Sequence, residues 1–326
     1  MNDKLPTNIH IRPATMADLS GVTDLIRKTD IAERGATDFT ADQILEIWQQ
    51  TEFHLETDAW VAVDHSNETS GTPPVVGYEE IWNRSEYSEL HGDGYVHPDY
   101  TGLGIGTALL HRMDSRGRQM ATLAPNGKRV YIRNGVSGSD TAARQLHEHE
   151  GYQLIRYFWR MEVDLLSPPP EPIWPAGLQM EVFSPDMDPD RLFAAMEDAF
   201  RDHWGYQPWD YEFLHKRMQL ESFDPNLWFF VWEGEQIAGG ALCSVREQIG
   251  WVNSLGVRQG WRKRGLGLAL LQHAFDEFYR REIRQAALNV DAANPTGATR
   301  LYQRAGMQVA HEYLLYEKVL QPGVEP

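Results

Sequence analysis

The chain has 326 residues, enough for two domains that each bury their own core, and its 30 basic against 47 acidic residues give a net charge of −17. This acidic balance argues against a nucleic-acid partner. A single cysteine excludes an internal disulfide framework, and no apolar run approaches the ~20 residues of a membrane span, so we expect a soluble, cytoplasmic protein with no membrane contact.

The first half of the chain alternates between strand and helix patterns. Residues 8–12 alternate in polarity like a strand, and apolar helical periods follow Asp18 and cover residues 41–50. Strands are expected at 59–63 and 75–82. A glycine-bearing segment and a further helix then follow.

A proline-rich stretch divides the chain near its middle. Residues 166–177 contain five prolines, which exclude a helix or an interior strand. Such a composition favours an extended, semi-rigid spacer. We therefore predict a linker here, with one domain over 8–165 and a second over 178–320.

The second half begins with the same kinds of element. Helical patterns cover 190–200 and 211–220, and a polar, aromatic segment lies between them. The predicted strands of this half are 178–183, 227–232, 236–245, 251–257 and 285–291.

The strand at 251–257 runs into a basic, glycine-bearing turn and then into an apolar helical period. Converging backbone N–H groups in such a turn, together with the unpaired donors of the following helix, form a nest that binds diphosphate. Neither the Rossmann nor the Walker pattern fits this loop, and a solvated basic turn is the structural alternative. The candidate ligand-binding residues are Leu255, Gly256, Val257, Arg262, Lys263, Arg264, Gly265, Leu266 and Gly267.

The same turn occurs earlier in the chain. Gly104 and Gly106 precede Gly265 and Gly267 by 161 positions each, and further apolar positions keep this offset. A later block repeats with an offset of 155, so the chain contains one architecture twice. The corresponding candidate residues of the first copy are Val96, Gly102, Gly104, Ile105 and Gly106.

The loop Arg262-x-x-Gly265-x-Gly267 resembles the acyl-CoA loop of the GNAT acyltransferases, written Gln/Arg-x-x-Gly-x-Gly/Ala. A second block, which contains Asn294 and Tyr302, matches the family in order and spacing. The resemblance implies an α/β protein with two tandem GNAT folds, each a mixed, largely antiparallel sheet flanked by helices. It also implies strands that splay beyond the loop, with the pantetheine arm of CoA in the gap.

The resemblance further implies an N-acetyltransferase that moves the acetyl group of acetyl-CoA directly onto a primary amine of a small molecule, without a metal. It places the general acid at Tyr302 and adds Asn294 to the CoA-binding set. The fourth strand of the second copy carries no carboxylate, so Glu247, just before it, is the nearest candidate base. His203, Trp204 and Tyr206 occupy the position of the family's acceptor-binding loop.

The first copy departs from the family pattern. Thr101 stands in the position of Arg262, and His147 replaces the tyrosine, so we expect a degenerate site. A tandem pair of this kind is similar in layout to the mycothiol synthases, but the glutamate expected on their fourth strand appears here as Trp251. Their substrate therefore does not carry over to this chain.

Two other functions are compatible with the sequence. A non-catalytic acyl-CoA sensor or scaffold would keep both copies for binding alone, and a protein N-acetyltransferase would use an open acceptor cleft. For the assembly we expect a monomer or a homodimer.

Overall fold

The computed structural model describes residues 5–66, 73–206, 208–220, 223–294 and 296–324. Its contacts divide the chain into two compact units. Unit 1 comprises the chain up to Tyr157 together with the segment from Glu312 onward, and unit 2 comprises Phe158–His311. Among the described residues, no helix has the length and apolarity that crossing a bilayer requires.

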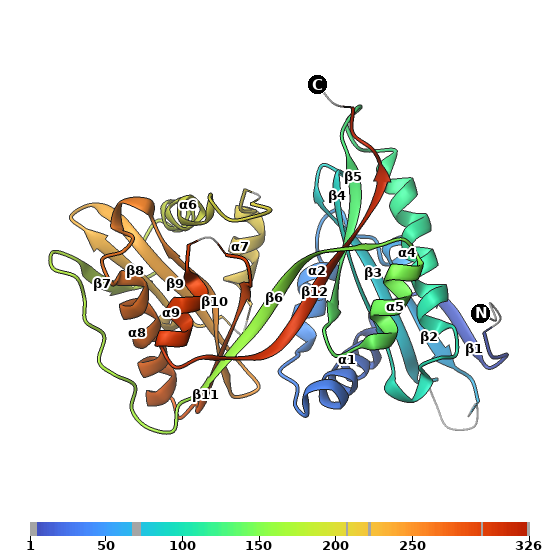
Figure 1. The fold of residues 1–326 in the computed structure, drawn as a ribbon, viewed down its shortest axis with the longest axis horizontal. Coiled ribbons are helices and arrows are strands. Elements are labelled where there is room, and N and C mark those ends of the chain that lie inside the picture. The colour runs from blue at the N-terminus through green and yellow to red at the C-terminus, as the bar shows by residue number, and fades with distance from the viewer. Residues whose placement is uncertain (1–4, 67–72, 207, 221–222, 295, 325–326) are drawn as a thin grey trace. The chain divides into compact units, whose positions relative to one another are not determined.

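Unit 1 is a sheet with helices on both faces (Figure 1). Neighbouring strands are antiparallel except β4 and β5, which are parallel. In spatial order the strands are β1 (Ile9–Pro13), β2 (Ala59–Asp64), β3 (Val75–Ser85), β4 (Glu89–Val96), β5 (Val130–Ser137) and β12 (Gln308–Gln321). The helices are α1 (Leu19–Arg34), α2 (Ala41–Trp48), α3 (Leu55–Asp58), α4 (Ile105–Ala121) and α5 (Thr141–His149), with 3-10 turns η1 (Met16–Asp18) and η2 (Pro98–Tyr100).

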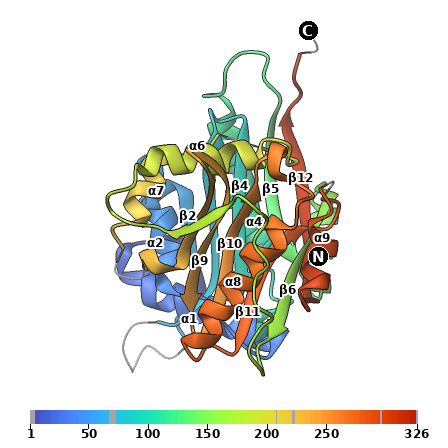
Figure 2. The same cartoon turned by 90° about the vertical axis from the view of Figure 1, so that its left-hand side faces the viewer.

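Unit 2 repeats this arrangement, with β10 and β11 as its parallel pair. Its strands, in spatial order, are β6 (Gln153–Asp164), β11 (Gln285–Asp291), β10 (Ile249–Val257), β9 (Gln236–Arg246), β8 (Trp228–Glu233) and β7 (Gln179–Val182). Its helices are α6 (Pro189–Phe200), α7 (Tyr211–Arg217), α8 (Leu266–Arg280) and α9 (Ala298–Arg304), with 3-10 turns η3 (Pro225–Leu227) and η4 (Gln259–Trp261). In the view of Figure 2, α6 and α7 (yellow) and α8 (orange) are seen against the sheet of this unit.

The order of elements predicted from the sequence is found in both units, with the four-residue helix α3 of unit 1 as an addition. Each unit is the mixed sheet flanked by helices that the resemblance implies. The residue bounds differ by a few positions. The helix expected over 211–220 ends at Arg217, and α8 begins at Leu266. The start of α8 has a local cause, because Gly265 adopts a left-handed φ of 91° and caps the helix inside the glycine loop.

The two halves of the chain exchange their last strands: β6, which ends the first half, belongs mostly to unit 2, and β12, which ends the second half, belongs mostly to unit 1. Residues of β6 from Phe158 onward pair with β11, and the part of β12 from Tyr313 onward pairs with β5 (Figure 1). The units therefore differ from the sequence-based domains 8–165 and 178–320, because residues 158–165 belong to unit 2 and residues 312–320 to unit 1. The linker 166–177 lies within unit 2 and contains no helix or strand.

Close packing between β10 and α8 fixes the start of the site. A Cβ built on Gly250 would lie 2.5 Å from ring atoms of Phe278, on the face of β10 that α8 covers. Farther along the strand, a Cβ on Gly256 would lie 2.9 Å from the Cβ of Ala199, on the face that α6 covers. Glycine at these two positions lets both helices approach β10 closely.

We expect Gly250→Ala to lower the free energy of unfolding by about 1–3 kcal/mol, because the added methyl group overpacks against a rigid, buried ring. Gly260→Ala is the matched control, since a Cβ there meets no atom within 4 Å. Chemical denaturation of both variants and the parent measures the difference. Equal stabilities for the two variants would contradict this account of the β10–α8 packing.

Candidate functional site

The site begins where the parallel pairing of β10 and β11 ends. The two strands pair from Ile249 with Gln285 to Trp251 with Ala287 and no farther, although both strands continue. The register between β10 and β9 shifts between Val252 and Ser254, which marks a bulge at this point. Beyond the bulge, β10 and β11 diverge and leave a gap that an extended ligand can enter as an added strand.

The glycine loop lies at the far end of β10. Gly265 has a φ of 91° and Lys263 a φ of 63°, so two turn residues are left-handed before α8 begins. In unit 1 the equivalent residues, Gly102 and Gly104, have φ values of 77° and 82°. The backbone of the loop is therefore alike in both units, and unit 1 uses glycine where unit 2 places a lysine in a conformation that costs side-chain-bearing residues about 1–2 kcal/mol.

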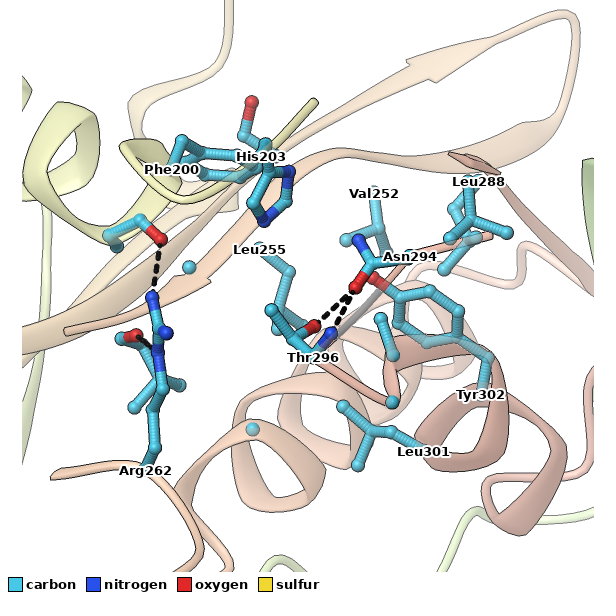
Figure 3. Close-up of a pocket in the computed structure, with 18 of the residues that line it drawn as sticks. Phe200, His203, Val252, Leu255, Arg262, Leu288, Asn294, Thr296, Leu301 and Tyr302 are labelled. Carbon is cyan, nitrogen blue, oxygen red and sulfur yellow. Dashed lines mark hydrogen bonds between the residues drawn. The ribbon is translucent and has the colours of Figure 1, made fainter. Parts of the chain in front are cut away.

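Most of the cations beside the loop bind protein acceptors. Arg262 donates from Nε to the carbonyl of Val257 and from Nη2 to the carbonyl of Ala199, both at 3.0 Å (Figure 3). Its Nη1 donates to Asp202 Oδ2 at 2.8 Å. Its guanidinium thus ties the end of β10 to the end of α6. Three of its five N–H donors are thus used within the protein, and the residue also lines the cavity described below.

The other arginines of this segment are similarly engaged. Arg264 forms an ion pair with Glu233 at 3.1 Å and does not line the cavity described below. Arg258 forms one with Asp198 at 2.8 Å. Among the described residues, Lys263 forms no ion pair, so it is the cation of this loop that remains available for an anionic ligand.

A cavity of about 900 Å³ occupies the gap between the strands and extends to the loop. It is formed within unit 2 mainly by β10, β11, the start of α8, α9 with the segment before it, and the end of α6 with the segment after it. Of the residues predicted from the sequence, those that line it are Leu255, Gly256, Val257, Arg262, Lys263, Gly265, Leu266, Gly267, Asn294, Tyr302, His203 and Trp204.

Tyr302 enters the cavity from α9 (Figure 3). Its side chain is buried, and burial raises the pKa of its hydroxyl to about 12. Among the described residues, its hydroxyl has no hydrogen-bond partner. A phenol held protonated at neutral pH and directed into a cavity can donate a proton or a hydrogen bond to a ligand there.

Asn294 is held by a local turn. Its Oδ1 accepts hydrogen bonds from the backbone N–H of Thr296 at 2.8 Å and from the hydroxyl of Thr296 at 2.5 Å (Figure 3). These contacts use the oxygen of the side-chain amide and leave its N–H donors for other acceptors.

Besides Arg264, two other residues predicted for the site of unit 2 lie outside the cavity. Glu247 occupies the tight turn between β9 and β10 with a φ of 46°, and it does not line the cavity. Tyr206 donates its hydroxyl to Glu197 Oε1 at 2.5 Å and also lies outside the lining. The placement of Glu247 follows from the hairpin geometry, because the turn lies at the end of β10 opposite to the glycine loop.

Several lining residues were not predicted. Asp202 and Asn253 carry no distinguishing local pattern, and Phe158 comes from β6, a strand that the sequence assigned to the other copy. The bulge that exposes Asn253 depends on pairing with β9, so only the folded sheet reveals it.

In unit 1 the position of Tyr302 is filled differently. His147 Nδ1 hydrogen-bonds the carbonyl of Ala143 at 2.8 Å, and its Nε2 lies 3.2 Å from Asn134 Nδ2. Because Nδ1 must carry the proton to donate to a carbonyl, Nε2 accepts from the amide. Gly94 of unit 1 is equivalent to Leu255 of unit 2, and the carboxylate of Glu79 packs against Gly94. A carboxylate therefore fills the space in unit 1 that the apolar side chain of Leu255 fills in unit 2.

Comparison with known proteins gives a family match over both units. The acetyltransferase (GNAT) family model matches residues 24–152 and 190–307. A mycothiol acetyltransferase of Thermobispora bispora is 33% identical over 222 residues, which cover 66% of this chain and 71% of that protein. A second, of Streptomyces scabiei, is 31% identical over 245 residues, which cover 74% and 76%.

Solved structures are similar along the whole chain. A GCN5-related N-acetyltransferase from Sphaerobacter thermophilus has 34% identity and a TM-score of 0.82, with 99% of each chain covered. A tandem GNAT protein from the clavulanic acid biosynthesis pathway has 14% identity and a TM-score of 0.72, with 97% of this chain and 100% of that chain covered. The second likeness concerns the fold alone.

Proposed function

This chain belongs to the GNAT acetyltransferase family, and from that premise we propose that unit 2 transfers the acetyl group of acetyl-CoA to a primary amine of a small molecule. The observation that carries the proposal is the meeting, in one cavity of about 900 Å³, of the glycine loop, the strand gap and the protonated Tyr302.

The diphosphate of CoA would bind the backbone N–H groups of Gly265, Leu266 and Gly267 at the start of α8. Lys263 supplies the nearby positive charge, since the arginines are engaged elsewhere. Gly267 also allows α8 to pack closely on α9, because a Cβ at this position would lie 3.1 Å from a methyl carbon of Leu301.

The pantetheine arm would then lie in the gap beside residues 255–257 of β10. A backbone N–H in this stretch can donate to the thioester carbonyl oxygen. Such a donor stabilises the oxyanion that forms when an amine attacks, which is commonly the largest electrostatic contribution to acyl transfer.

Transfer is direct in this proposal. The nitrogen of the acceptor bonds to the carbonyl carbon, the carbon–sulfur bond breaks, and Tyr302 gives its proton to the departing thiolate. Cys243 is buried on β9, where burial raises the pKa of its thiol, so it is a poor nucleophile.

The relatives named mycothiol acetyltransferases support a small-molecule acceptor. Trp251 stands where the resemblance to them implies a glutamate, so their acceptor is not carried over to this chain. The indole of Trp251 contacts the guanidinium groups of Arg160 and Arg246, whose Cζ atoms lie 4.6 and 4.2 Å from the ring centroid.

A screen of primary amines tests the proposal, with acetyl-CoA as donor and release of free CoA as the signal. Amino sugars, aminothiols, amino-acid esters and peptides with a free N-terminus make up the screen. We expect turnover with members of the small-molecule classes and acetylated amine in the mass spectrum. CoA binding without turnover on any amine would instead indicate a sensor or scaffold, and turnover on peptides alone would indicate a protein acetyltransferase.

We expect Gly265→Glu to abolish most of the CoA affinity, because the carboxylate would occupy the nest and repel the diphosphate. Gly234→Glu is the control, since Gly234 also has a positive φ, of 59°, with no atom within 4 Å of an added Cβ, and lies outside the cavity. Titration calorimetry with CoA compares them. An unchanged dissociation constant in Gly265→Glu would contradict binding at this loop.

We expect Tyr302→Phe to lower kcat by about 10²–10⁴-fold while the affinity for acetyl-CoA changes little. The ring keeps its packing, and only the proton donor to the thiolate is removed. His147→Phe, the equivalent change in unit 1, should leave kcat nearly unchanged. Steady-state kinetics on an amine from the screen measures both, and similar losses in the two variants would show that the two units share the chemistry.

A further inference from the structure

The acceptor of a GNAT reaction reaches the enzyme as an ammonium ion and must lose a proton before it can attack. An alkylammonium has a pKa of ~10, so little free amine exists at neutral pH. No carboxylate of β10 lines the cavity, and Glu247 lies outside it. A base supplied by a side chain would therefore come from another element.

We propose that the imidazole of His203 is the base that removes this proton. The proposal rests on the acetyl transfer proposed above and adds a residue to it. His203 lines the cavity from the segment after α6, and Figure 3 shows its ring directed into the cavity. Tyr302 enters from α9, so the base and the acid come from different elements around the same cavity.

The protein holds the ring in place without using its nitrogens. The ring packs edge-to-face on Phe200 with centroids 4.7 Å apart, and the backbone N–H of His203 donates to the carbonyl of Phe200 at 2.9 Å. Among the described residues, neither ring nitrogen has a hydrogen-bond partner. Both nitrogens are therefore available to a ligand in the cavity.

Other proton acceptors in the described lining are engaged. Asp202 accepts from Arg262 at 2.8 Å, and Asp291 Oδ1 accepts from the backbone N–H of Ala293 at 2.9 Å. Tyr302, with a pKa of about 12, is protonated at neutral pH and can act only as a donor. His203 is the imidazole among the described lining residues, and imidazole is the side chain whose ordinary pKa is nearest to neutral pH.

The charges around His203 favour its neutral form. Burial and then the positive charge of Arg262 lower the pKa of the imidazole, while the negative charges of Asp291 and Asp202 oppose this shift. The net direction is downward from the ordinary value of about 6.5. The neutral ring, which is the basic form, is thus present at neutral pH and is lost as the pH falls through the lowered pKa.

The protons balance over the whole reaction. His203 takes one proton from the ammonium, and the free amine bonds to the carbonyl carbon of the thioester. As the carbon–sulfur bond breaks, the thiolate takes the proton of Tyr302, and the new amide nitrogen loses its extra proton to the tyrosinate. His203 then releases its proton to water, so the products are the amide, free CoA and one proton.

The test uses acceptors of graded basicity with the full chain. Ethylamine and its mono-, di- and trifluorinated analogues are small enough for the cavity, and each fluorine makes the ammonium more acidic, so that trifluoroethylamine is uncharged at neutral pH. At pH 7 we expect His203→Gln to lower kcat/KM for ethylamine by about 10²–10⁴-fold. For trifluoroethylamine we expect a loss of less than about tenfold, because that amine needs no base before it attacks.

The pH profile gives a second readout. Between pH 7 and 9 the parent should show a nearly constant kcat/KM for ethylamine, whereas His203→Gln should gain about tenfold per pH unit as free amine forms. A residue that only packs or binds would lower the whole profile by one constant factor. Titration of the parent's imidazole by NMR, which needs no variant, should give a pKa below 6.5 for His203.

His215→Gln is the matched control. His215 lies on α7, contacts Asp190 at 2.7 Å and does not line the cavity, so its replacement should change neither readout. The assignment of the base would be overturned if His203→Gln lowered kcat/KM equally for every amine in the series. It would also be overturned if Asp291→Asn, and not His203→Gln, lost more activity with the more basic amines. Either result would leave the transferase function standing. A parent that binds acetyl-CoA but acetylates no amine, in this series or in the screen, would overturn both proposals.

Discussion

The site depends on the point where the parallel ladder between β10 and β11 stops. Both strands are held on their outer sides, β10 by β9 and β11 by β6, so their divergence beyond Trp251 opens a gap without unravelling the sheet. The bulge after Val252 turns the next residues of β10 and brings Leu255 to the face that α8 and α9 cover. A ligand in this gap would complete the backbone pairing that the two strands leave open.

Arg262 connects this gap to the rest of unit 2. Its three hydrogen bonds join the end of β10 to Ala199 and Asp202, immediately before His203. The glycine loop and the segment that carries the proposed base are thereby held by one side chain. The same guanidinium charge favours the neutral form of the His203 imidazole, so Arg262 has a structural and an electrostatic role within the protein.

The two units show how one backbone carries different chemistry. Their glycine loops share left-handed conformations, and their parallel pairs both end partway along the strands. At the position of Tyr302, however, unit 1 has His147, whose two ring nitrogens are engaged by Ala143 and Asn134. A side chain whose polar atoms are satisfied within the core is poorly suited to exchange protons with a ligand, which agrees with a division of labour between the units.

The amino-acid sequence by itself determined the order of the elements, the duplication and the glycine loop, since these depend on local periodicity and on residues such as Gly265 that permit a left-handed backbone. Only the tertiary structure decided which strand completes which sheet, because the pairing of β6 with β11 and of β12 with β5 joins residues far apart in the sequence. It also decided the partners of Arg262 and the exclusion of Glu247 from the cavity. Those outcomes depend on hydrogen bonds and hairpin ends between residues far apart in sequence, and no local pattern encodes such distances.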